Sequence, residues 1–439
     1  MARNTGRTHV ALTTAVAVVL ALPLWAEGHG GDHWVSAWST AVHAPLPFPG
    51  LPPSPVFENQ TVRMIIRPTI GGQRLRVRFS NAFGATALKI GAARVALSSR
   101  GAAIAPESDR ALTFGGRPSV SIPPGAPMLS DAIDLKVLPF SEVAVSVYLP
   151  EKTASSTGHF WAQHDSYISE RGDFTAKPDI PNPTTRTSWY FLADLEVLAP
   201  GQAAVTVALG DSITDGVGAK QGEYSDWPDL LADRLAKTRG GPTLSIVNEG
   251  IGGNRILHDG AGVSALSRFD RDVLAQPGVA NLIVLESIND IGFPHLKPRL
   301  PDGTVLKELP FTHEVVSAED LIIALQQIID RAHQHGIRVF GATLTPFEGA
   351  DYYSDDGEAE RQAVNQWIRT SGAFDGVFDF DAAVRDPNHP SQFREGYHSG
   401  DHLHPSATGY KAMADAINLG VLRKGREEAG RQSLPEATK

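Results

Sequence analysis

The pattern of apolar and polar positions divides the chain into two parts. From His33 to about Leu195 the apolar runs are short, and glycine and proline interrupt them often. Such spacing is typical of strands joined by turns. The expected strands cover residues 61–67, 74–79, 92–97, 120–122, 143–148 and 189–195. Many short strands predict an all-β antiparallel sandwich or jelly-roll domain over residues 33–197.

Two of these segments predict a local pairing. Residues 61–67 and 74–79 both alternate apolar with polar or basic side chains, and the segment between them contains Gly71 and Gly72. Glycine-containing turns favour hairpins because glycine readily adopts positive φ. We therefore expect these two strands to form a hairpin across residues 70–73.

After a short connector at residues 198–204 the rhythm changes to strands followed by long amphipathic helices. The expected strands cover residues 205–209, 244–248, 282–286, 338–343 and 376–380. The expected helices cover residues 227–237, 263–275, 318–335, 358–369 and 406–419. Strands alternating with helices predict a three-layer α/β domain with a parallel sheet, here over residues 203–422.

One helix carries clear start and stop residues. Ser317 and Asp320 form the pattern of a capping box, and Gly336 is suited to a left-handed helix end. The tail at residues 423–439 is charged, and we expect it to be frayed and disordered.

The first 26 residues predict export. Arg3 and Arg7 precede an apolar run from Val10 to Ala26 that is interrupted by threonines and by Pro23. This is the pattern of a cleaved signal peptide at residues 1–26, and the run is shorter than a membrane span requires. We therefore expect a secreted or periplasmic protein without stable membrane insertion.

The amino-acid composition restricts the kinds of partner and substrate that the protein is expected to bind. The chain has 49 acidic and 39 basic residues and no cysteine. An acidic balance disfavours nucleic acid as a partner, and the absence of cysteine excludes disulfides and thiolate metal sites. A small, neutral or weakly charged substrate fits this composition better.

Candidate chemistry lies at the ends of the expected parallel strands. Ser212 lies in the segment GDSITDG at residues 210–216, directly after a strand. Taken alone, this segment fits an ordinary strand-to-helix turn equally well. The glycine-rich loop 250–254 follows the second strand, Asn289 follows the third, and DHLHP at 401–405 precedes the last helix. Functional residues of such sheets gather beyond the carboxyl ends of the strands, so these four segments are expected to converge.

These segments, in this order, resemble the blocks of the SGNH (GDSL-type) hydrolase superfamily over roughly residues 203–422. The loop GIGGNR at 250–255, the DHLHP segment and the β-rich first half are similar to the two-domain branch of xylanase-cluster acylesterases. The resemblance implies a flavodoxin-like α/β domain and a serine esterase that needs no cofactor. Its substrates would be short acyl esters, acetyl esters above all, of carbohydrates or aryl alcohols.

The resemblance also implies roles for five residues. Ser212 is the expected nucleophile, His404 the general base, and Asp401 the acid that orients the base. Ser212 and Gly253 are expected to donate backbone N–H groups to the oxyanion, and Asn289 its side-chain amide.

One position departs from the family pattern, which usually has glycine where this chain has Ser287. A positive φ there would strain the serine by roughly 1 kcal/mol or more and displace Asn289. We expect negative φ instead, because strained non-glycine residues are uncommon.

Other side chains near the motifs have ordinary explanations. Four of them are expected to brace loops by hydrogen bonds: Asp211, Asp215, Asn254 and Asp290. His402 invites a metal site with Asp401, but a second ligand cluster is missing, so we expect no metal and no cofactor.

Two alternative functions stay open. The first is a lipase or lysophospholipase, which the lack of an extended apolar lid segment disfavours. The second is an inactive carbohydrate-binding relative, for which Ser287 is the only support.

Overall fold

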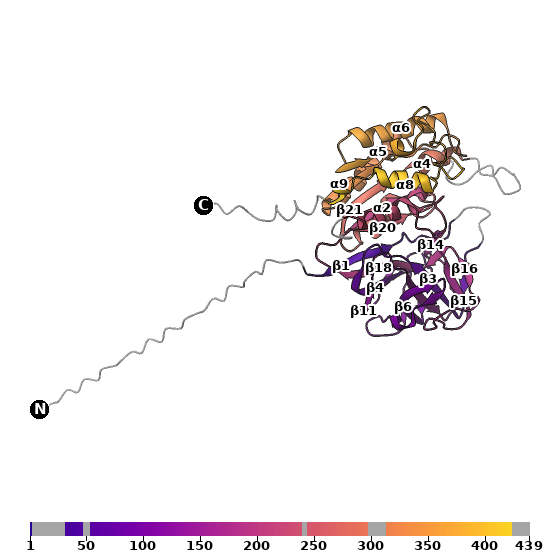
Figure 1. The fold of residues 1–439 in the computed structure, drawn as a ribbon, viewed down its shortest axis with the longest axis vertical. Helices are drawn as coiled ribbons and strands as arrows, with labels where there is room; N and C mark the ends of the chain where they lie inside the picture. The colour runs from indigo at the N-terminus through magenta and orange to yellow at the C-terminus, as the bar shows by residue number, and fades with distance from the viewer. Residues whose placement is uncertain (2–30, 47–52, 239–243, 297–312, 424–439) are drawn as a thin grey trace.

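The structure is a computed structural model that describes residues 1, 31–46, 53–238, 244–296 and 313–423 (Figure 1). The expected signal peptide and C-terminal tail lie outside these ranges, apart from Met1 and Arg423. Within the described ranges, no helix is long and apolar enough to cross a membrane.

The described residues before Ala204 form antiparallel strands and one 3-10 helix, η1 (Pro106–Ser108). One sheet contains β1 (His33–Ser39), β18 (Leu192–Ala199), β4 (Gly72–Ser80) and β10 (Pro127–Leu129), in that order, with β11 (Ile133–Val137) also on β4. A second sheet has the order β16 (Thr184–Arg186), β15 (Ser166–Arg171), β3 (Gln60–Ile66), β12 (Val143–Leu149), β6 (Ala92–Arg100) and β7 (Ala103–Ile104), with β8 (Arg110–Ala111) on β6. Three small pairs complete this half: β2 (Val56–Phe57) with β13 (Thr153–Ala154), β5 (Leu88–Ile90) with β9 (Val120–Ile122), and β14 (Gly158–Phe160) with β17 (Ser188–Tyr190).

The expected hairpin across residues 70–73 is wrong. β3 pairs with β12 and β15, whereas β4 pairs with β18, β10 and β11 in the other sheet. The connection leaves the sheet of β3 after Ile66, and the backbone N–H of Thr69 then donates to the carbonyl of Ala37 on β1, in the other sheet, at 2.9 Å. Gly71 packs so closely on Val137 that a Cβ there would lie 2.4 Å from the Val137 carbonyl oxygen. The glycines therefore serve a crossing between sheets rather than a hairpin turn.

The second half contains a five-stranded parallel sheet with the order β20 (Leu244–Gly250), β19 (Ala204–Gly210), β21 (Val279–Leu285), β22 (Arg338–Ala342) and β23 (Gly376–Phe378). Its strands β19 and β21 are mostly apolar and buried, as expected for a sheet covered on both faces. The strand order reverses between β19 and β21, so a crevice for ligands is expected beyond the carboxyl ends of these two strands.

The helices of this half form two groups. α8 (Ala407–Ala416) contacts α2 (Trp227–Ala236) and α7 (Phe380–Val384), and α5 (Ala318–Gln334) contacts α3 (Ala265–Phe269) and α6 (Asp355–Thr370). Shorter elements are α1 (Ser212–Asp215), α4 (Ile288–Gly292), α9 (Leu419–Arg423), the π-helix η2 (Asp270–Leu274) and the 3-10 helix η3 (Phe293–His295). The capping box at Ser317 and the left-handed Gly336 are confirmed. The single helix expected at 406–419 is wrong, because α8 ends at Ala416 and α9 begins at Leu419.

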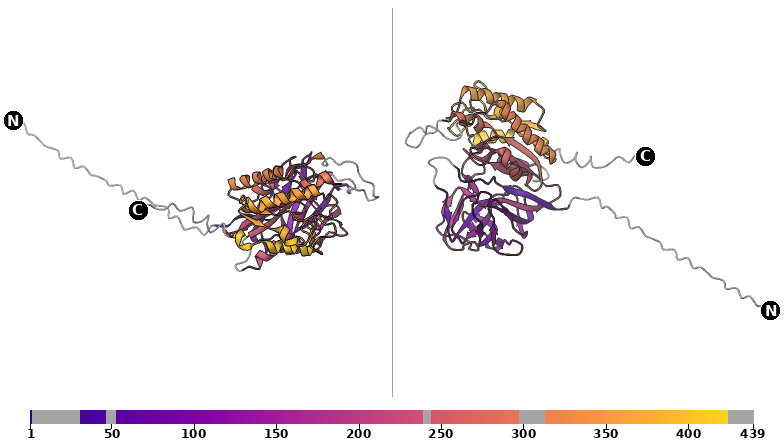
Figure 2. Two further views of the ribbon diagram at one scale, coloured as in Figure 1. Left: turned by 90° about the horizontal axis from the view of Figure 1, so that it is seen from above. Right: turned by 180° about the vertical axis from the view of Figure 1, so that it is seen from behind.

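The two halves share one hydrophobic core and several buried polar contacts. Strand β1 continues from the antiparallel sheet to the edge of the parallel one, where Thr40 forms a parallel bridge with Asn248. Figures 1 and 2 show the early strands, indigo to purple, stacked against the later α/β half in views from front and back. Ser39 donates to the Glu249 carboxylate across this junction, and Thr69 donates to the carbonyl of Ile246 at 3.0 Å.

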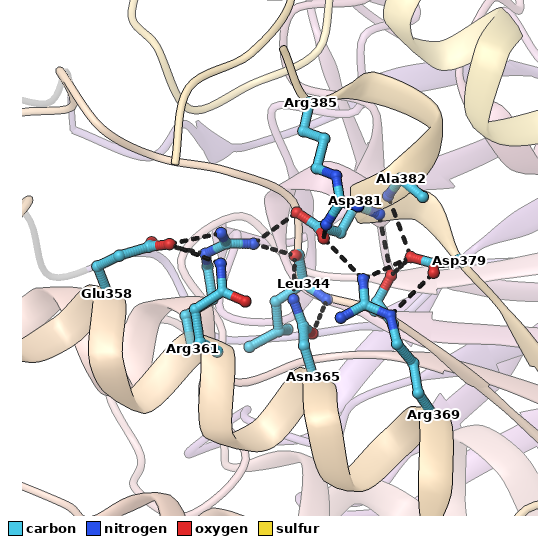
Figure 3. A network of polar contacts seen from close by, with 11 residues as sticks. Leu344, Glu358, Arg361, Asn365, Arg369, Asp379, Asp381, Ala382 and Arg385 are labelled. Carbon is cyan, nitrogen blue, oxygen red and sulfur yellow. Dashed lines mark hydrogen bonds and ion pairs between the residues drawn. The ribbon is translucent and has the colours of Figure 1, made fainter. Parts of the chain in front are cut away.

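A network of ion pairs fixes the segment that follows β22 (Figure 3). Buried Arg361 on α6 contacts Asp381 at 2.8 Å and donates to the carbonyl of Leu344, also at 2.8 Å. Asn365 accepts from the N–H of Leu344 at 2.7 Å and returns a hydrogen bond to its carbonyl at 2.9 Å. The chain beyond Leu344 leads to Tyr352, so α6 and α7 hold the start of a segment that lines the site described next.

Candidate active site

Ser212 begins α1, directly after the buried strand β19. Asp211 caps this helix, and its carboxylate accepts from the N–H of Ile213 at 2.8 Å. A Cβ at Gly210 would lie 2.4 Å from the carbonyl oxygen of Leu285, so only glycine allows the strand to turn here beside its neighbour. The turn brings the Ser212 hydroxyl to the carboxyl edge of the sheet, and the residue as a whole is 5% exposed.

His404 and Asp401 approach Ser212 from the loop before α8. Nε2 of His404 lies 2.8 Å from Oγ of Ser212, and Nδ1 lies 2.6 Å from the Asp401 carboxylate. The carboxylate requires a proton on Nδ1, which leaves Nε2 of the neutral ring free to accept the serine proton. This geometry is the one that a serine nucleophile requires for activation by an imidazole.

The Asp401 carboxylate is held in its ionised form. Partial burial alone would raise the pKa of Asp401, but the hydrogen bond and charge of His404 outweigh it. The N–H groups of Leu403 and His404 donate to the same carboxylate at 3.0 and 2.9 Å. The pKa of Asp401 therefore lies well below its ordinary value, and the group remains an anion through the neutral range.

Gly253 and Asn289 lie with the other three expected residues in one cavity of about 500 Å³. Gly253 has φ of +79°, which glycine adopts without strain. The Asn289 amide donates to the carbonyl of Asn254 at 2.9 Å, and its oxygen accepts from the hydroxyl of Tyr352 at 3.3 Å. These two bonds orient the amide so that its NH₂ group lies on the side opposite to Tyr352. The structure thus brings all five expected residues together.

Ser287 contradicts the expectation of negative φ. It has φ of +106° and ψ of −14°, in the left-handed region, as the residue before α4. Its hydroxyl is buried and has no hydrogen-bond partner. The expectation was wrong because the tight turn from β21 into α4 fixes the backbone, and the surrounding buried structure holds the serine in it. Asn289 nevertheless reaches the cavity.

The four residues expected to brace loops do so, but the carboxyl groups among them are unusually buried. The Asp290 carboxylate accepts from the N–H groups of Ile256 and Leu257 at 2.8 and 3.1 Å. Burial raises the pKa of Asp211 to about 7 and that of Asp290 to about 6. Burial therefore favours the protonated form of these two carboxyl groups beneath the site. Buried Arg268 lies among them, and its guanidinium donates to the carbonyl of Gly210 at 2.9 Å and to Asn254 at 2.9 Å.

Two contributions from the first half of the chain were missed by the sequence analysis. His159 on β14 contacts the Asp215 carboxylate at 2.8 Å, at the end of the helix that carries Ser212. Trp161, two residues further, lines the cavity of Ser212. Neither residue lies in a recognisable motif, and more than 50 residues separate each from its partner. Only the fold brings them to the site.

His402, which was weighed for metal binding, and the tryptophans near the start of the β-rich half have other contacts. His402 stacks on His398 with ring centroids 4.2 Å apart. In the described part of the chain, no group of three or more histidine or acidic side chains is placed to hold a metal ion. Trp38 is buried and packs edge-on against Trp189, whereas Trp34 lies under the guanidinium of Arg76.

Comparison with known proteins identifies the domain around this site. Residues 208–412 match the model of the GDSL-like Lipase/Acylhydrolase family. No curated protein matches the chain by sequence. The second half of the chain therefore carries a domain of the GDSL family, and the protein is an ester hydrolase.

Solved structures similar to the chain include three hydrolases. An acetylxylan esterase from Geobacillus stearothermophilus is 20% identical with a TM-score of 0.35, covering 48% of this chain and 91% of its own. A GDSL-like lipase from Bacteroides thetaiotaomicron is 15% identical with a TM-score of 0.33, covering 52% and 89%. An alpha/beta hydrolase enzyme from the metagenome of Lake Arreo, Spain, is 20% identical with a TM-score of 0.36, covering 49% and 94%. At these values the likeness carries no inference about substrate.

Proposed function

We propose that this GDSL-family protein is a secreted serine esterase that hydrolyses short-chain acyl esters, acetyl esters of carbohydrates or aryl alcohols above all. One observation carries the proposal: the unbroken chain of hydrogen bonds from Ser212 through His404 to Asp401, at 2.8 and 2.6 Å, inside a cavity. We further propose that the α/β half is flavodoxin-like, that the first half makes this a two-domain xylanase-cluster type of acylesterase, and that residues 1–26 are removed on export.

The reaction follows from the positions of the side chains. His404 takes the proton of Ser212 as Oγ bonds to the ester carbonyl carbon, and Asp401 stabilises the imidazolium that forms. The carbonyl oxygen becomes an oxyanion, which accepts from the N–H groups of Ser212 and Gly253 and from the amide of Asn289. The imidazolium then returns its proton to the departing alcohol as the tetrahedral intermediate collapses to the acyl-enzyme.

Water completes the cycle. His404 removes a proton from a water molecule whose oxygen attacks the acyl carbon. Collapse of the second tetrahedral intermediate breaks the bond to Ser212, which regains a proton from His404 as the carboxylic acid leaves.

The test combines covalent labelling with hydrolysis. A fluorophosphonate probe should label the wild-type protein and not Ser212→Ala, and His404→Ala should also lose labelling because the two groups act as one unit. Both variants should lose nearly all hydrolysis of p-nitrophenyl acetate. Ser371→Ala, which changes an exposed serine at the end of α6, is the matched control and should behave as wild type. Substantial activity in Ser212→Ala at unchanged Tm would reject the mechanism.

Two further measurements address the remaining parts of the proposal. Amino-terminal sequencing of the exported protein should begin near Glu27. Hydrolysis of p-nitrophenyl esters of increasing chain length should fall beyond short acyl groups, and a maximum at long chains would favour a lipase instead.

A further inference from the structure

Trp161 is exposed on the wall of the catalytic cavity, although it is one of the largest apolar side chains of the protein. It is 39% exposed, whereas Trp38 and Trp189 in the same half are 9% and 8% exposed. An exposed tryptophan forgoes the burial that normally stabilises this side chain. Such exposure at the edge of a site is typical of a surface that awaits a ligand.

The backbone around Trp161 is held in an unusual conformation. Trp161 has φ of +68° and Gln163 has φ of +55°, both in the left-handed region that non-glycine residues seldom adopt. Strain of this kind persists only when the surroundings fix it, and it gathers at functional sites.

Contacts on both sides of Trp161 hold the backbone in this conformation. His159 before it contacts Asp215 of the catalytic half at 2.8 Å. After it, the N–H of Ala162 donates to the carbonyl of Thr187, and the carbonyl of Gln163 accepts from the N–H of Gly222, both at 2.9 Å. The backbone that carries Trp161 is therefore held at the junction between the two halves of the protein.

Trp161 also lines a second cavity of about 620 Å³, and so forms a wall shared with the cavity of Ser212. The residues that line the second cavity include the aromatic Phe160 and Tyr190, the polar Arg186 and Ser188, and also Leu46 and three prolines. A ligand that reaches both cavities must pass the indole. Flat rings beside hydroxyl and guanidinium groups suit a sugar, which has an apolar ring face and hydroxyl groups at its edge, better than they suit an acyl chain.

We infer that Trp161 is the stacking platform of a saccharide subsite, which binds the alcohol part of the ester while the acyl group lies at Ser212. This inference rests on the proposed function and names its substrate class as an acylated oligosaccharide. The β-rich half thereby contributes substrate specificity to a catalytic site whose reacting groups all come from the other half.

The test compares two acetyl esters that differ in their alcohol. Ethyl acetate has an alcohol too small to stack on the indole, whereas the inference places a sugar unit of acetylated xylotriose against Trp161. Trp161→Ala should lower kcat/KM for acetylated xylotriose roughly tenfold more than it lowers kcat/KM for ethyl acetate, which is the expected effect of losing one aromatic stacking contact. Trp161→Tyr should recover part of the loss because it restores a flat ring.

Controls separate stacking from general damage. Trp367→Ala makes the same substitution on α6, where Trp367 packs on Phe374, and should leave the ratio of the two kcat/KM values unchanged. Tm of each variant shows that it is folded. Unacetylated xylotriose should competitively inhibit ethyl acetate hydrolysis by the wild-type enzyme and lose this effect in Trp161→Ala.

Three outcomes would overturn the inference. An unchanged kcat/KM of Trp161→Ala on acetylated xylotriose, or an equal loss on both esters, would remove the subsite while leaving the esterase proposal intact. A selective loss on p-nitrophenyl octanoate would place an acyl chain, rather than a sugar, at Trp161. A wild-type enzyme that hydrolyses ethyl acetate but neither hydrolyses the saccharide ester nor is inhibited by xylotriose would reject both the subsite and the carbohydrate part of the proposed function.

Discussion

At the scale of single residues, Ser287 lowers the free energy of unfolding although it lies beside the active site. Its left-handed backbone and unpaired buried hydroxyl are both unfavourable. Ser287→Gly should therefore raise the free energy of unfolding by about 1 kcal/mol, after the greater unfolded-state entropy of glycine is subtracted. Urea unfolding measures this directly. The matched control is Ser371→Gly, where φ is −66° and glycine should only destabilise.

Substitution of Asn289 tests whether the strained turn at Ser287 still places this side chain for catalysis. If its amide donates to the oxyanion, Asn289→Ala should lower kcat by roughly 10²–10³ with little change in KM, because the contact strengthens in the transition state. Steady-state kinetics on p-nitrophenyl acetate give both constants. Wild-type kcat in this variant would show that Asn289 is outside the oxyanion hole.

Asp211 gives a prediction about pH. Burial raises its pKa to about 7, so between about pH 4 and pH 7 the folded state holds a proton that the unfolded state has lost. The stability that this proton confers is present below the unfolded pKa and is lost as the pH rises through the folded pKa. Asp211→Asn keeps an oxygen for the N–H of Ile213 and cannot ionise. It should therefore raise Tm relative to wild type more at pH 8 than at pH 5, and an equal effect at both values would contradict the assignment.

At the scale of elements, α1 is too short to be stable alone, and the first half of the chain holds its end. Both ring nitrogens of His159 face oxygen acceptors: the carbonyl of Ala41 at 2.9 Å and the Asp215 carboxylate at 2.8 Å. Only the imidazolium can donate to both. Burial would lower the pKa of His159, but Asp215 outweighs it, and the pKa of His159 is raised.

The contact between His159 and Asp215 should therefore stabilise the protein measurably. His159→Ala leaves a buried carboxylate without its partner and should cost about 3 kcal/mol of unfolding free energy. The wild-type contribution is complete below about pH 6.5 and is lost as the pH rises through the raised pKa. The difference between wild type and variant, followed by urea unfolding, should thus shrink at high pH. His159→Gln keeps one donor and should recover part of the loss.

The helices and strands of the second half could be predicted because the spacing of apolar residues within each segment shows whether it is a helix or a strand. α5 and β22 lie within one residue of the ranges expected for them, and the five candidate residues share one cavity as their strand-end positions suggested. Pairings of the first half were not predictable, because β14 joins β17 and β1 joins β18 across long stretches of chain. Gly71 and Gly72 suggested a hairpin turn, although the segment crosses between two sheets, because glycines fit either geometry.

At the scale of the whole molecule, the junction between the halves is buried rather than flexible. Glu249 at the carboxyl end of β20 accepts from Ser39 of β1 and from Gln276, and burial raises its pKa well above the usual range. The apolar cluster runs without a break through both halves. Neither feature is visible in the sequence, because the polar groups at the junction resemble ordinary surface residues until the fold covers them.

This continuity predicts that the two halves unfold together. Separating them would expose apolar surface and leave Glu249 without the hydroxyl of Ser39, so a state with only one half folded should be unfavourable. Differential scanning calorimetry of the full chain should show a single transition with equal calorimetric and van't Hoff enthalpies. Ser39→Ala should lower that one Tm without splitting the transition. Two separated transitions, or an isolated fragment 203–422 that folds with the Tm of the full protein, would show instead that the α/β half is independent of the strands that carry His159 and Trp161.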